Sequence, residues 1–235
     1  VSTFGFHPEA DYQVVYDATV LRVGILREGM WVTQWTNQMP GAHNALNAAA
    51  AVILAHQIGA EWEEAADAIG GFAGLDRRLQ RLGTRETSDG GQVVVYDDYG
   101  HHPVEIAAVL RAARQRVEST GGKVHAIHQP HRFSRLSSLF EDFCTCFNEA
   151  DSVLIADVFT AGEAPIEGAD ASALVAGIQA RGHRSAGYLA DAGDLAARVR
   201  ERAEPGDLVV CLGAGSITAW ANALPEQLAV GDKAP

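Results

Sequence analysis

Four polar or glycine-rich segments of this sequence each follow a short run of apolar, β-branched residues. They are Asp-Asp-Tyr-Gly-His-His-Pro at 97–103, Gln-Pro-His-Arg-Phe-Ser-Arg at 129–135, Asp-Val-Phe-Thr-Ala-Gly at 157–162 and Gly-Ala-Gly-Ser-Ile-Thr at 213–218. Arginine binds carboxylates and phosphates through paired hydrogen bonds, and a glycine-rich turn that opens a helix offers backbone N–H groups to an anion. Together the segments predict a binding site for an anionic ligand.

The apolar runs predict the strands that must position these segments. Helical patterns separate the runs, and near-continuous apolar strands alternating with helices indicate a mostly parallel sheet covered on both faces. Ligands of such a sheet bind beyond the carboxyl ends of its strands, so the four segments should meet at one edge. The expected strands are 92–96, 124–128, 152–156 and 207–212, and the expected helices are 103–119, 134–148, 171–181 and 192–203.

The first part of the chain has a different pattern. Residues 1–39 are typical of β-structure, and helical patterns follow at 44–59 and 62–69, each ended by glycine. A shift in composition places a domain boundary near residue 73. The expected fold class is α/β, with a Rossmann-like C-terminal domain whose mostly parallel sheet has helices on both faces, preceded by a partial α/β domain. The expected divisions are 1–73, 74–225 and a tail at 226–235.

Composition argues against several classes of function. The chain has 235 residues, with 18 Lys and Arg, 30 Asp and Glu, and a net charge of −12. This balance disfavours sequence-independent nucleic-acid binding, which needs clustered cations. No apolar run reaches the roughly 20 residues that span a bilayer, so no membrane partner is expected. Three cysteines do not indicate a disulfide framework, and the cytoplasm is the expected compartment.

Each motif also has a purely structural interpretation. Gly213–Thr218 is similar to a dinucleotide fingerprint, but the strand and the acidic residue that should follow it are missing, and it could be only a tight turn. Asp97 or Asp98 could simply cap the following helix. His101 and His102 are adjacent and point in different directions, so no metal site is expected from them.

Two motifs in the first part of the chain add candidate contacts. In Gly-Ala-His-Asn-Ala-Leu-Asn at 41–47, Asn44 and Asn47 lie three residues apart and share one helical face, where asparagine can hydrogen-bond a purine. His43 and Asn44 could also merely cap that helix. Phe-Ala-Gly-Leu-Asp-Arg-Arg at 72–78 places two arginines at the domain junction, in a hinge or a plain linker.

In this order the motifs resemble the Mur ligase family. One departure is Leu79, where the family usually has phenylalanine. The family implies three domains, and the resemblance covers only the end of the central ATPase domain and the whole C-terminal domain. Because the sequence contains no Gly-x-x-x-x-Gly-Lys-Ser/Thr motif, we expect a fragment that lacks the P-loop and the UDP-binding domain and is inactive alone. The marks of the resemblance are Gly-x-His-Asn-x-x-Asn at 41–47, Phe-x-Gly-x-x-Arg-Arg at 72–78, Asp-Asp-Tyr-Gly-His-His-Pro at 97–103, Gln-Pro-His-Arg-Phe-x-Arg at 129–135 and Gly-Ala-Gly-x-Ile-Thr at 213–218.

The resemblance implies an ATP-dependent amide ligation in peptidoglycan synthesis. The carboxylate of UDP-N-acetylmuramate would take the γ-phosphoryl group of ATP, and the amine of L-alanine would then displace phosphate. Mg²⁺ would accompany ATP, with its ligands mostly outside this chain. The alternatives are a recycling ligase that adds a tripeptide to the same sugar nucleotide and a non-catalytic nucleotide-binding module. Pro-His-Arg at 130–132 speaks against the recycling ligase.

The resemblance also implies roles for individual residues. Arg78 would reach the terminal phosphates of ATP, and His101 would assist deprotonation of the ammonium group or position the acceptor. Arginine would hold the alanine carboxylate. Contacts to ATP are implied for His43, Asn44, Asn47, Arg78 and Asp98. Contacts to the incoming amino acid are implied for Tyr99, His101, Arg132, Arg135, Gly213, Ala214 and Gly215.

Overall fold

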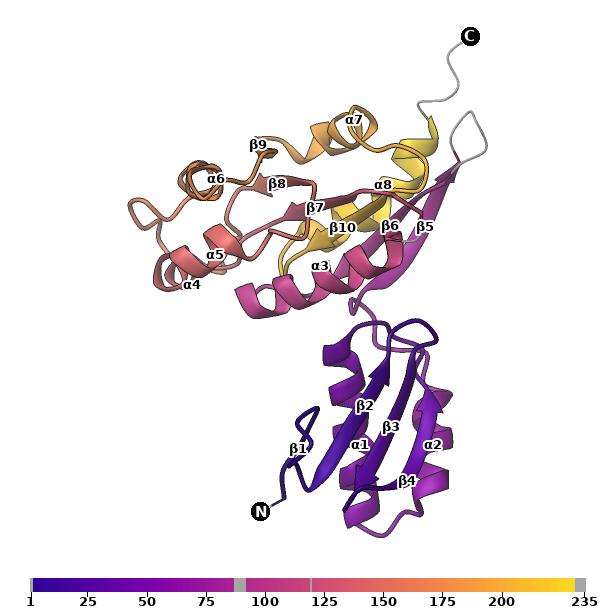
Figure 1. Ribbon diagram of the computed structural model, residues 1–235. Coiled ribbons are helices and arrows are strands. Elements are labelled where there is room, and N and C mark those ends of the chain that lie inside the picture. Colours follow the sequence, from indigo (N-terminus) through magenta and orange to yellow (C-terminus); the bar gives the residue numbers. More distant parts are fainter. Residues whose placement is uncertain (1, 87–91, 119, 231–235) are drawn as a thin grey trace. The chain divides into compact units, whose positions relative to one another are not determined.

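The computed structural model describes residues 2–86, 92–118 and 120–230. The chain consists of two compact units, Val1–Leu75 and Asp76–Pro235 (Figure 1). This division lies next to the boundary expected near residue 73. Each unit has its own sheet and its own hydrophobic core. Within the described ranges, no helix has the length and apolar character needed to cross a bilayer.

The first unit contains a four-stranded sheet and two helices (Figure 1). The elements are β1 (Phe4–Gly5), β2 (Tyr12–Asp17), β3 (Arg22–Arg27), β4 (Met30–Thr36), α1 (Ala42–Gln57) and α2 (Trp62–Gly70). The strands lie in chain order; β1 is parallel to β2, and the other neighbours are antiparallel. Glu28 and Gly29 have φ angles of 53° and 76°, as a two-residue hairpin between β3 and β4 requires.

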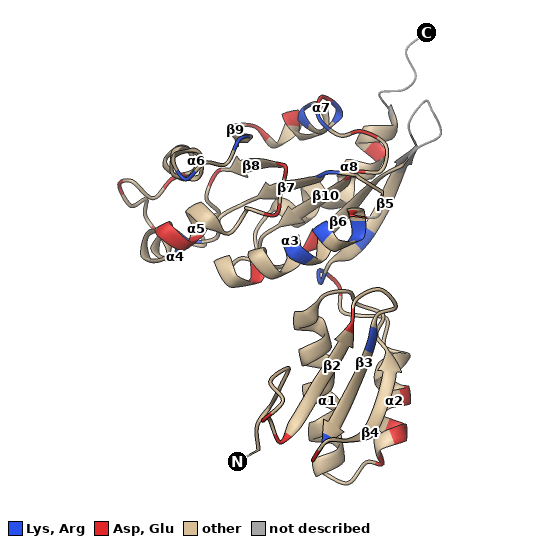
Figure 2. Cartoon of the chain, in the orientation of Figure 1, with Lys and Arg blue, Asp and Glu red and all other residues tan. Residues whose placement is uncertain are grey.

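Side-chain alternation gives this sheet one apolar face, which packs against the helices. Val14 and Ile25 are buried with Ala45 and Ala49 of α1. The small alanine side chains let the helix approach the strands closely, and α1 contains no charged residue. Figure 2 marks acidic residues on α2 in red, and the two buried residues of this helix are alanines. The first unit therefore has a core made largely by a sheet and two alanine-rich helix faces.

The second unit contains a six-stranded sheet. Its strands are β5 (Gln80–Glu86), β6 (Gln92–Asp98), β7 (Val124–His128), β8 (Ser152–Ala156), β9 (Ala186–Leu189) and β10 (Leu208–Leu212). The order is β5-β6-β10-β7-β8-β9, and only the pairing of β5 with β6 is antiparallel. The mostly parallel sheet expected from the four apolar runs is confirmed. The edge strands β5 and β9 were not expected from the sequence.

Helices cover both faces of this sheet (Figure 1). They are α3 (Pro103–Val117), α4 (Phe133–Ser138), α5 (Phe140–Thr145), α6 (Ala171–Ala180), α7 (Leu195–Arg200) and α8 (Ile217–Val230), with a 3₁₀ turn at Ala192–Asp194. Residues of α3 to α6 share one buried cluster, and those of α7 and α8 share the other. The helix expected at 134–148 is interrupted at Leu139, where the backbone (φ −118°, ψ 24°) is not helical.

The prediction of a tail from residue 226 is wrong for residues 226–230, which are helical. α8 continues to Val230, because Leu224 and Leu228 are fully buried against the sheet and hold the helix there. Pro225 lies within the helix and packs against Gly83 of β5, where an added Cβ would come within 3.0 Å of its ring. The rest of the expected tail, residues 231–235, lies outside the described residues.

Candidate functional site

The sheet order brings the four polar segments to one edge of the second unit. β10 lies between β6 and β7, β8 follows β7, and all four run parallel, so their carboxyl ends are neighbours (Figure 1). Backbone hydrogen bonds join adjacent tips. Gly213 N–H donates to the Asp98 carbonyl at 3.0 Å, and Gln129 N–H donates to the Leu212 carbonyl at 3.1 Å. The tips are therefore fixed relative to one another before any ligand binds.

Asp98 anchors the start of the second unit to this edge. Its carboxylate is buried, with Oδ2 accepting the Leu79 N–H and Oδ1 accepting the Gly100 N–H, each at 2.7 Å. Burial raises the pKa of Asp98 to about 6, although these two bonds act in the opposite direction. Each oxygen retains acceptor capacity, so contact with a ribose stays a prediction. The cap of α3 is instead His102, which forms a capping box with Glu105.

Arg77 is a site residue that the sequence reasoning did not single out. Its Nη2 donates to the Gly213 carbonyl at 2.5 Å, its Nε lies 3.4 Å from Asp97 Oδ2, and its guanidinium lies 4.6 Å from the centre of the Tyr99 ring. Burial raises the pKa of the Asp97 carboxyl, and the Arg77 charge opposes that shift. The left-handed backbone of Arg77 (φ 62°) turns this arginine into the unit. The paired-arginine motif was the available signal.

Arg78, the arginine chosen from the sequence, is exposed. Its guanidinium lies 5.9 Å from the centre of the Tyr99 ring, which Arg77 also contacts. Burial raises the pKa of Asp98 by more than the Arg78 charge lowers it. Burial also acts to raise the pKa of Glu105, but hydrogen bonds from backbone N–H groups and nearby positive charge, including that of Arg78, outweigh it and lower that pKa. The neighbouring arginines thus differ: Arg77 is fixed to the protein, and Arg78 presents its charge to solvent.

Histidines from two tips lie near each other. The His101 ring meets the Tyr99 ring edge-on at 5.1 Å and lies 6.1 Å from the His131 ring. His101 Nδ1 lies 2.9 Å from the Tyr99 carbonyl. A carbonyl oxygen only accepts, so this contact places the proton on Nδ1 and leaves Nε2 as the basic nitrogen of His101.

Arg132 and Arg135 follow the tip of β7. Arg132 has φ 72°, a backbone strain of the kind often found at functional sites, and its N–H donates to the Phe159 carbonyl at 2.9 Å. Its half-exposed side chain carries Nη1 4.0 Å from Glu163 Oε1. Arg135 Nη1 donates to the His131 carbonyl at 3.2 Å and lies 3.3 Å from His131 Nδ1. Burial lowers the pKa of His131, and the charge of Arg135 lowers it further.

Glu163 joins the tip of β8 to the start of α4. It accepts the Ser134 N–H at 2.9 Å and the Ser134 hydroxyl at 2.7 Å. These bonds satisfy one of the free donors at a helix start, and they hold the carboxylate next to Arg132. No local pattern in the sequence marks this residue, because its partner Ser134 lies 29 positions earlier in the chain.

The glycine turn after β10 needs its glycines for close packing. A Cβ at Gly213 would lie 2.8 Å from the Gln129 carbonyl oxygen, and a Cβ at Gly215 would lie 2.5 Å from Gln129 Oε1. Gln129 is buried; its Oε1 accepts the Ile217 N–H and its Nε2 donates to Ser216 Oγ, both at 3.0 Å. One donor at the start of α8 is thus already occupied, and half-buried Ala214 and Gly215 are the parts of the turn left to contact a ligand.

The predicted site residues of the first unit lie at the start of α1. Asn44 is buried, and its Nδ2 donates to the Pro40 carbonyl at 2.8 Å. Asn47 is exposed one turn further along, and His43 is half-buried. Gly41, with φ 102°, is the residue before the helix and donates its N–H to the Tyr16 hydroxyl at 3.0 Å. The structure therefore gives Asn44 a role in fixing the turn; adenine contacts stay a prediction.

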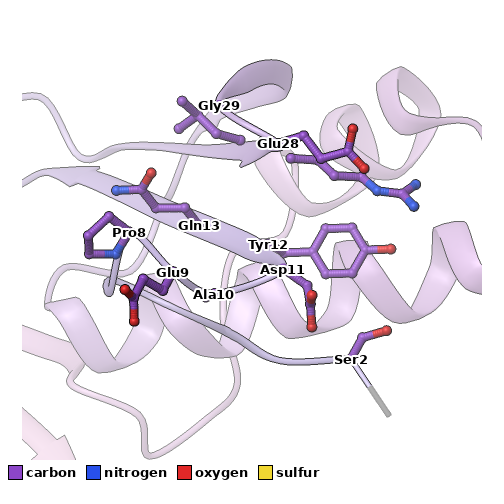
Figure 3. A pocket seen from close by; sticks show the side chains of 11 residues that line it. Ser2, Pro8, Glu9, Ala10, Asp11, Tyr12, Gln13, Glu28 and Gly29 are labelled. Atoms are coloured by element: carbon purple, nitrogen blue, oxygen red, sulfur yellow. The ribbon is translucent and has the colours of Figure 1, made fainter.

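A pocket of about 380 Å³ lies elsewhere in the first unit, beside β2 and the β3–β4 hairpin (Figure 3). Its lining includes the carboxylates of Glu9, Asp11 and Glu28, and it contains none of the residues implied to bind ATP or the amino acid. Such a lining does not suit a phosphate-rich ligand. Among the described residues, no group of three histidine, cysteine or acidic side chains could hold a metal ion.

Residues 77–215 match the family model described as Mur ligase, glutamate ligase domain. The chain belongs to the Mur ligase family. The matched range begins at Arg77 and ends at Gly215, so it contains three of the four polar segments in full and the first three residues of the segment at 213–218. The edge assembled from these tips is therefore the candidate active-site edge of a Mur ligase domain.

Curated Mur ligases resemble this chain along nearly its whole length. UDP-N-acetylmuramate–L-alanine ligase of Paracoccus denitrificans is 52% identical over 240 residues, which cover 97% of this chain and 49% of that protein. The enzyme of the same name from Methylorubrum populi is 59% identical over 191 residues, covering 81% and 39%. The chain spans about half the length of the curated relatives it matches.

Solved structures of Mur ligases share the fold. UDP-N-acetylmuramate–alanine ligase of Thermotoga maritima has a TM-score of 0.78 at 22% identity, covering 98% of this chain and 48% of that one. A murein peptide ligase of Psychrobacter arcticus has a TM-score of 0.66 at 21% identity, covering 99% and 47%. At these identities the likeness shows the arrangement of the strands and helices that carry the site.

Proposed function

We propose that this chain forms part of a cytoplasmic, ATP-dependent ligase that joins L-alanine to the carboxylate of UDP-N-acetylmuramate through an acyl phosphate. The observation that carries the proposal is the pair Arg132 and Arg135 beside His101 and His131 at one edge of the sheet. The identity of about half of all residues to ligases of that name supports the choice of substrates. A further structural neighbour, MurF ligase of Thermotoga maritima, was solved in complex with ADP.

The charges at this edge suit the incoming amino acid. A free amino acid offers only a carboxylate, an ammonium group and its side chain. Arg132 and Arg135 would hold the carboxylate, because a guanidinium matches its geometry. Removal of a proton from the ammonium group makes the amine a nucleophile, and His101 Nε2 is the nitrogen with a free lone pair. Tyr99 and the turn at Ala214 and Gly215 would complete the acceptor side, with Gly213 holding the turn in place.

The contacts on the phosphoryl-transfer side are assigned from the family resemblance, residue by residue. Negative charge develops in both steps, so cations at the reacting groups are the main source of catalysis. Arg78 is the exposed cation of the second unit that we assign to the terminal phosphates. Asp98 would contact the ribose, and His43, Asn44 and Asn47 of the first unit would contact adenine. Mg²⁺ would accompany ATP and reduce the repulsion between its phosphates and the attacking carboxylate.

Phosphate release tests the proposal. The protein to assay contains this chain together with the half that the curated relatives have in addition. With UDP-N-acetylmuramate and Mg-ATP, we expect release that requires L-alanine, at about 1 per second or faster. The 235-residue chain alone should show none. Release that requires the tripeptide instead of alanine would favour the recycling ligase, and no amino-acid dependence would contradict ligation.

A further inference from the structure

Phe159 is an exposed aromatic residue at the tip of β8, beside the two candidate arginines. Its backbone is fixed from both sides: its N–H donates to the Pro130 carbonyl at 2.8 Å, and its carbonyl accepts the Arg132 N–H at 2.9 Å. The two segments pair there as a parallel bridge between His131 and Phe159. The position of the Phe159 ring is therefore tied to the segment that carries Arg132 and Arg135.

The ring is held on two sides and open on another. It stacks on the His131 imidazole, with 5.4 Å between ring centres and 16° between planes. It also lies against Gly215, where an added Cβ would be 2.6 Å from Phe159 Cγ. Nevertheless 37% of the residue is exposed. A large apolar ring that is fixed in place and still open to solvent can form a rigid wall for a ligand.

This wall is continuous with the carboxylate-binding groups. Arg135 Nη1 lies 3.3 Å from His131 Nδ1, and the His131 ring stacks on Phe159. Guanidinium, imidazole and phenyl groups thus follow one another along the surface. In an α-amino acid the side chain leaves the atom next to the carboxylate. An amino acid held by these arginines must therefore place its side chain within reach of the His131–Phe159 stack.

We propose that Phe159 sets the size limit for the side chain of the incoming amino acid, an inference that rests on the function proposed above. A methyl group packs against the ring. A longer side chain must displace the Phe159 ring, which already packs against His131 and Gly215. The phenyl ring itself offers no hydrogen-bond partner to a polar side chain. The arginines would bind the carboxylate, and Phe159 would discriminate between side chains of different size.

The test compares two amino acids in one assay. In the protein that also contains the other half of the relatives, we measure kcat/KM for L-alanine and for L-2-aminobutyrate, which is longer by one methylene. Such a difference is worth roughly 10- to 200-fold in an apolar pocket. Phe159→Ala should reduce the preference for L-alanine by about tenfold or more. Phe159→Trp should act in the opposite direction and raise the preference for glycine over L-alanine.

Controls separate a size limit from general damage. Ile166→Ala removes a similarly exposed side chain of the same unit, 39% exposed, and should leave the ratio unchanged. If Phe159→Ala does not fold, Phe159→Leu keeps an apolar group and should still relax the preference. An equal loss for both amino acids, with an unchanged ratio, would overturn the size limit alone. No alanine-dependent turnover in the unmodified protein would overturn the proposed function and the size limit with it.

Discussion

His125 Nε2 lies 2.8 Å from Asp207 Oδ2, with both side chains buried at the amino ends of the strands. His125 Nδ1 lies 2.8 Å from Ser152 Oγ, and Asp207 also accepts the N–H groups of Lys123 and Glu204. The set has the residue types of a hydrolase triad. Burial and full pairing assign it instead to holding β7, β8 and β10 together, at the end of the sheet opposite the arginines.

Asp207→Ala should destabilise the chain strongly. The change leaves the His125 imidazole and two backbone N–H groups without their buried partner, and removing one member of a buried pair costs about 3–5 kcal/mol. Urea unfolding of the 235-residue chain measures the effect. Glu204→Gln, which removes the exposed ion pair with Lys123, is the control and should not shift the midpoint measurably. Equal shifts in the two variants would contradict the assignment.

Arg132→Ala or Arg135→Ala should weaken the use of L-alanine specifically. A charge-assisted hydrogen bond contributes roughly 1.5–3 kcal/mol, so the KM for L-alanine should rise by roughly 10- to 150-fold. The KM for ATP should change little. Lysine should rescue only in part, because it lacks the planar fork.

Arg78→Ala provides the opposite pattern for comparison. It should damage phosphoryl transfer more than alanine binding. If the variants at 132 and 135 instead left the KM for L-alanine unchanged and weakened only ATP, the two sides of the site would be assigned the wrong way round.

Glu163→Gln should raise the KM for L-alanine, by less than Arg132→Ala does. Glutamine keeps an acceptor for the Ser134 N–H, so the start of α4 should persist while the charge beside Arg132 is lost. Steady-state kinetics with separate alanine and ATP titrations provide the measurement. Glu141→Gln, in an exposed ion pair with Arg181 just beyond the end of α6, is the matched control. A drop in kcat with unchanged KM values would argue against a positioning role for Glu163.

His128 should make stability depend on pH. Burial lowers the pKa of this fully enclosed histidine to about 4 from its ordinary 6.5. Because the pKa is lower in the folded protein, the unfolded chain binds the proton at a higher pH than the folded chain does. The contribution of neutral His128 to the free energy of unfolding is therefore complete above pH 6.5 and is lost as pH falls to 4. At about 1.4 kcal/mol per unit, the loss amounts to about 3 kcal/mol.

His128→Leu removes this dependence and is the variant to compare. The Leu212 carbonyl, which His128 Nδ1 contacts, still accepts the Gln129 N–H in this variant. Asp98, with its pKa raised to about 6, acts in the opposite direction: its contribution to stability falls as pH rises from 4 to 6. The difference between variant and unmodified protein at each pH isolates His128. A constant difference from pH 4 to 7 would contradict the prediction.

The sequence predicted the parts of the fold that local patterns determine. β6, β7, β8 and β10 are largely buried on both faces, so each appears as a near-continuous apolar run, and their parallel order places the polar tips at one edge. β5 reads Gln-Arg-Leu-Gly-Thr-Arg-Glu and β9 reads Ala-Gly-Tyr-Leu. Both lie at sheet edges, where no apolar run is required, and so neither was recognisable.

The missed site residues act through contacts that are distant in sequence. Arg77 meets a carbonyl 136 positions later, and Gln129 meets Ser216 87 positions later. Residue type alone cannot show which of two neighbouring arginines, Arg77 or Arg78, turns inward. The backbone of Arg77 and the packing around Gly213 decide that. Residue types thus indicated the chemistry of the edge, and tertiary contacts determined which side chains are fixed and which remain open.

The central place of β10 has a consequence for synthesis of the protein on the ribosome. β6 and β7 do not pair with each other; each pairs with β10, which is the strand of this sheet made last. A nascent chain that stops before Leu208 contains the pair β5–β6 and the group β7–β8–β9, but it lacks the strand that joins them. The second unit therefore completes its sheet only after translation has passed this strand, and until then β6 and β7 each lack a neighbouring strand.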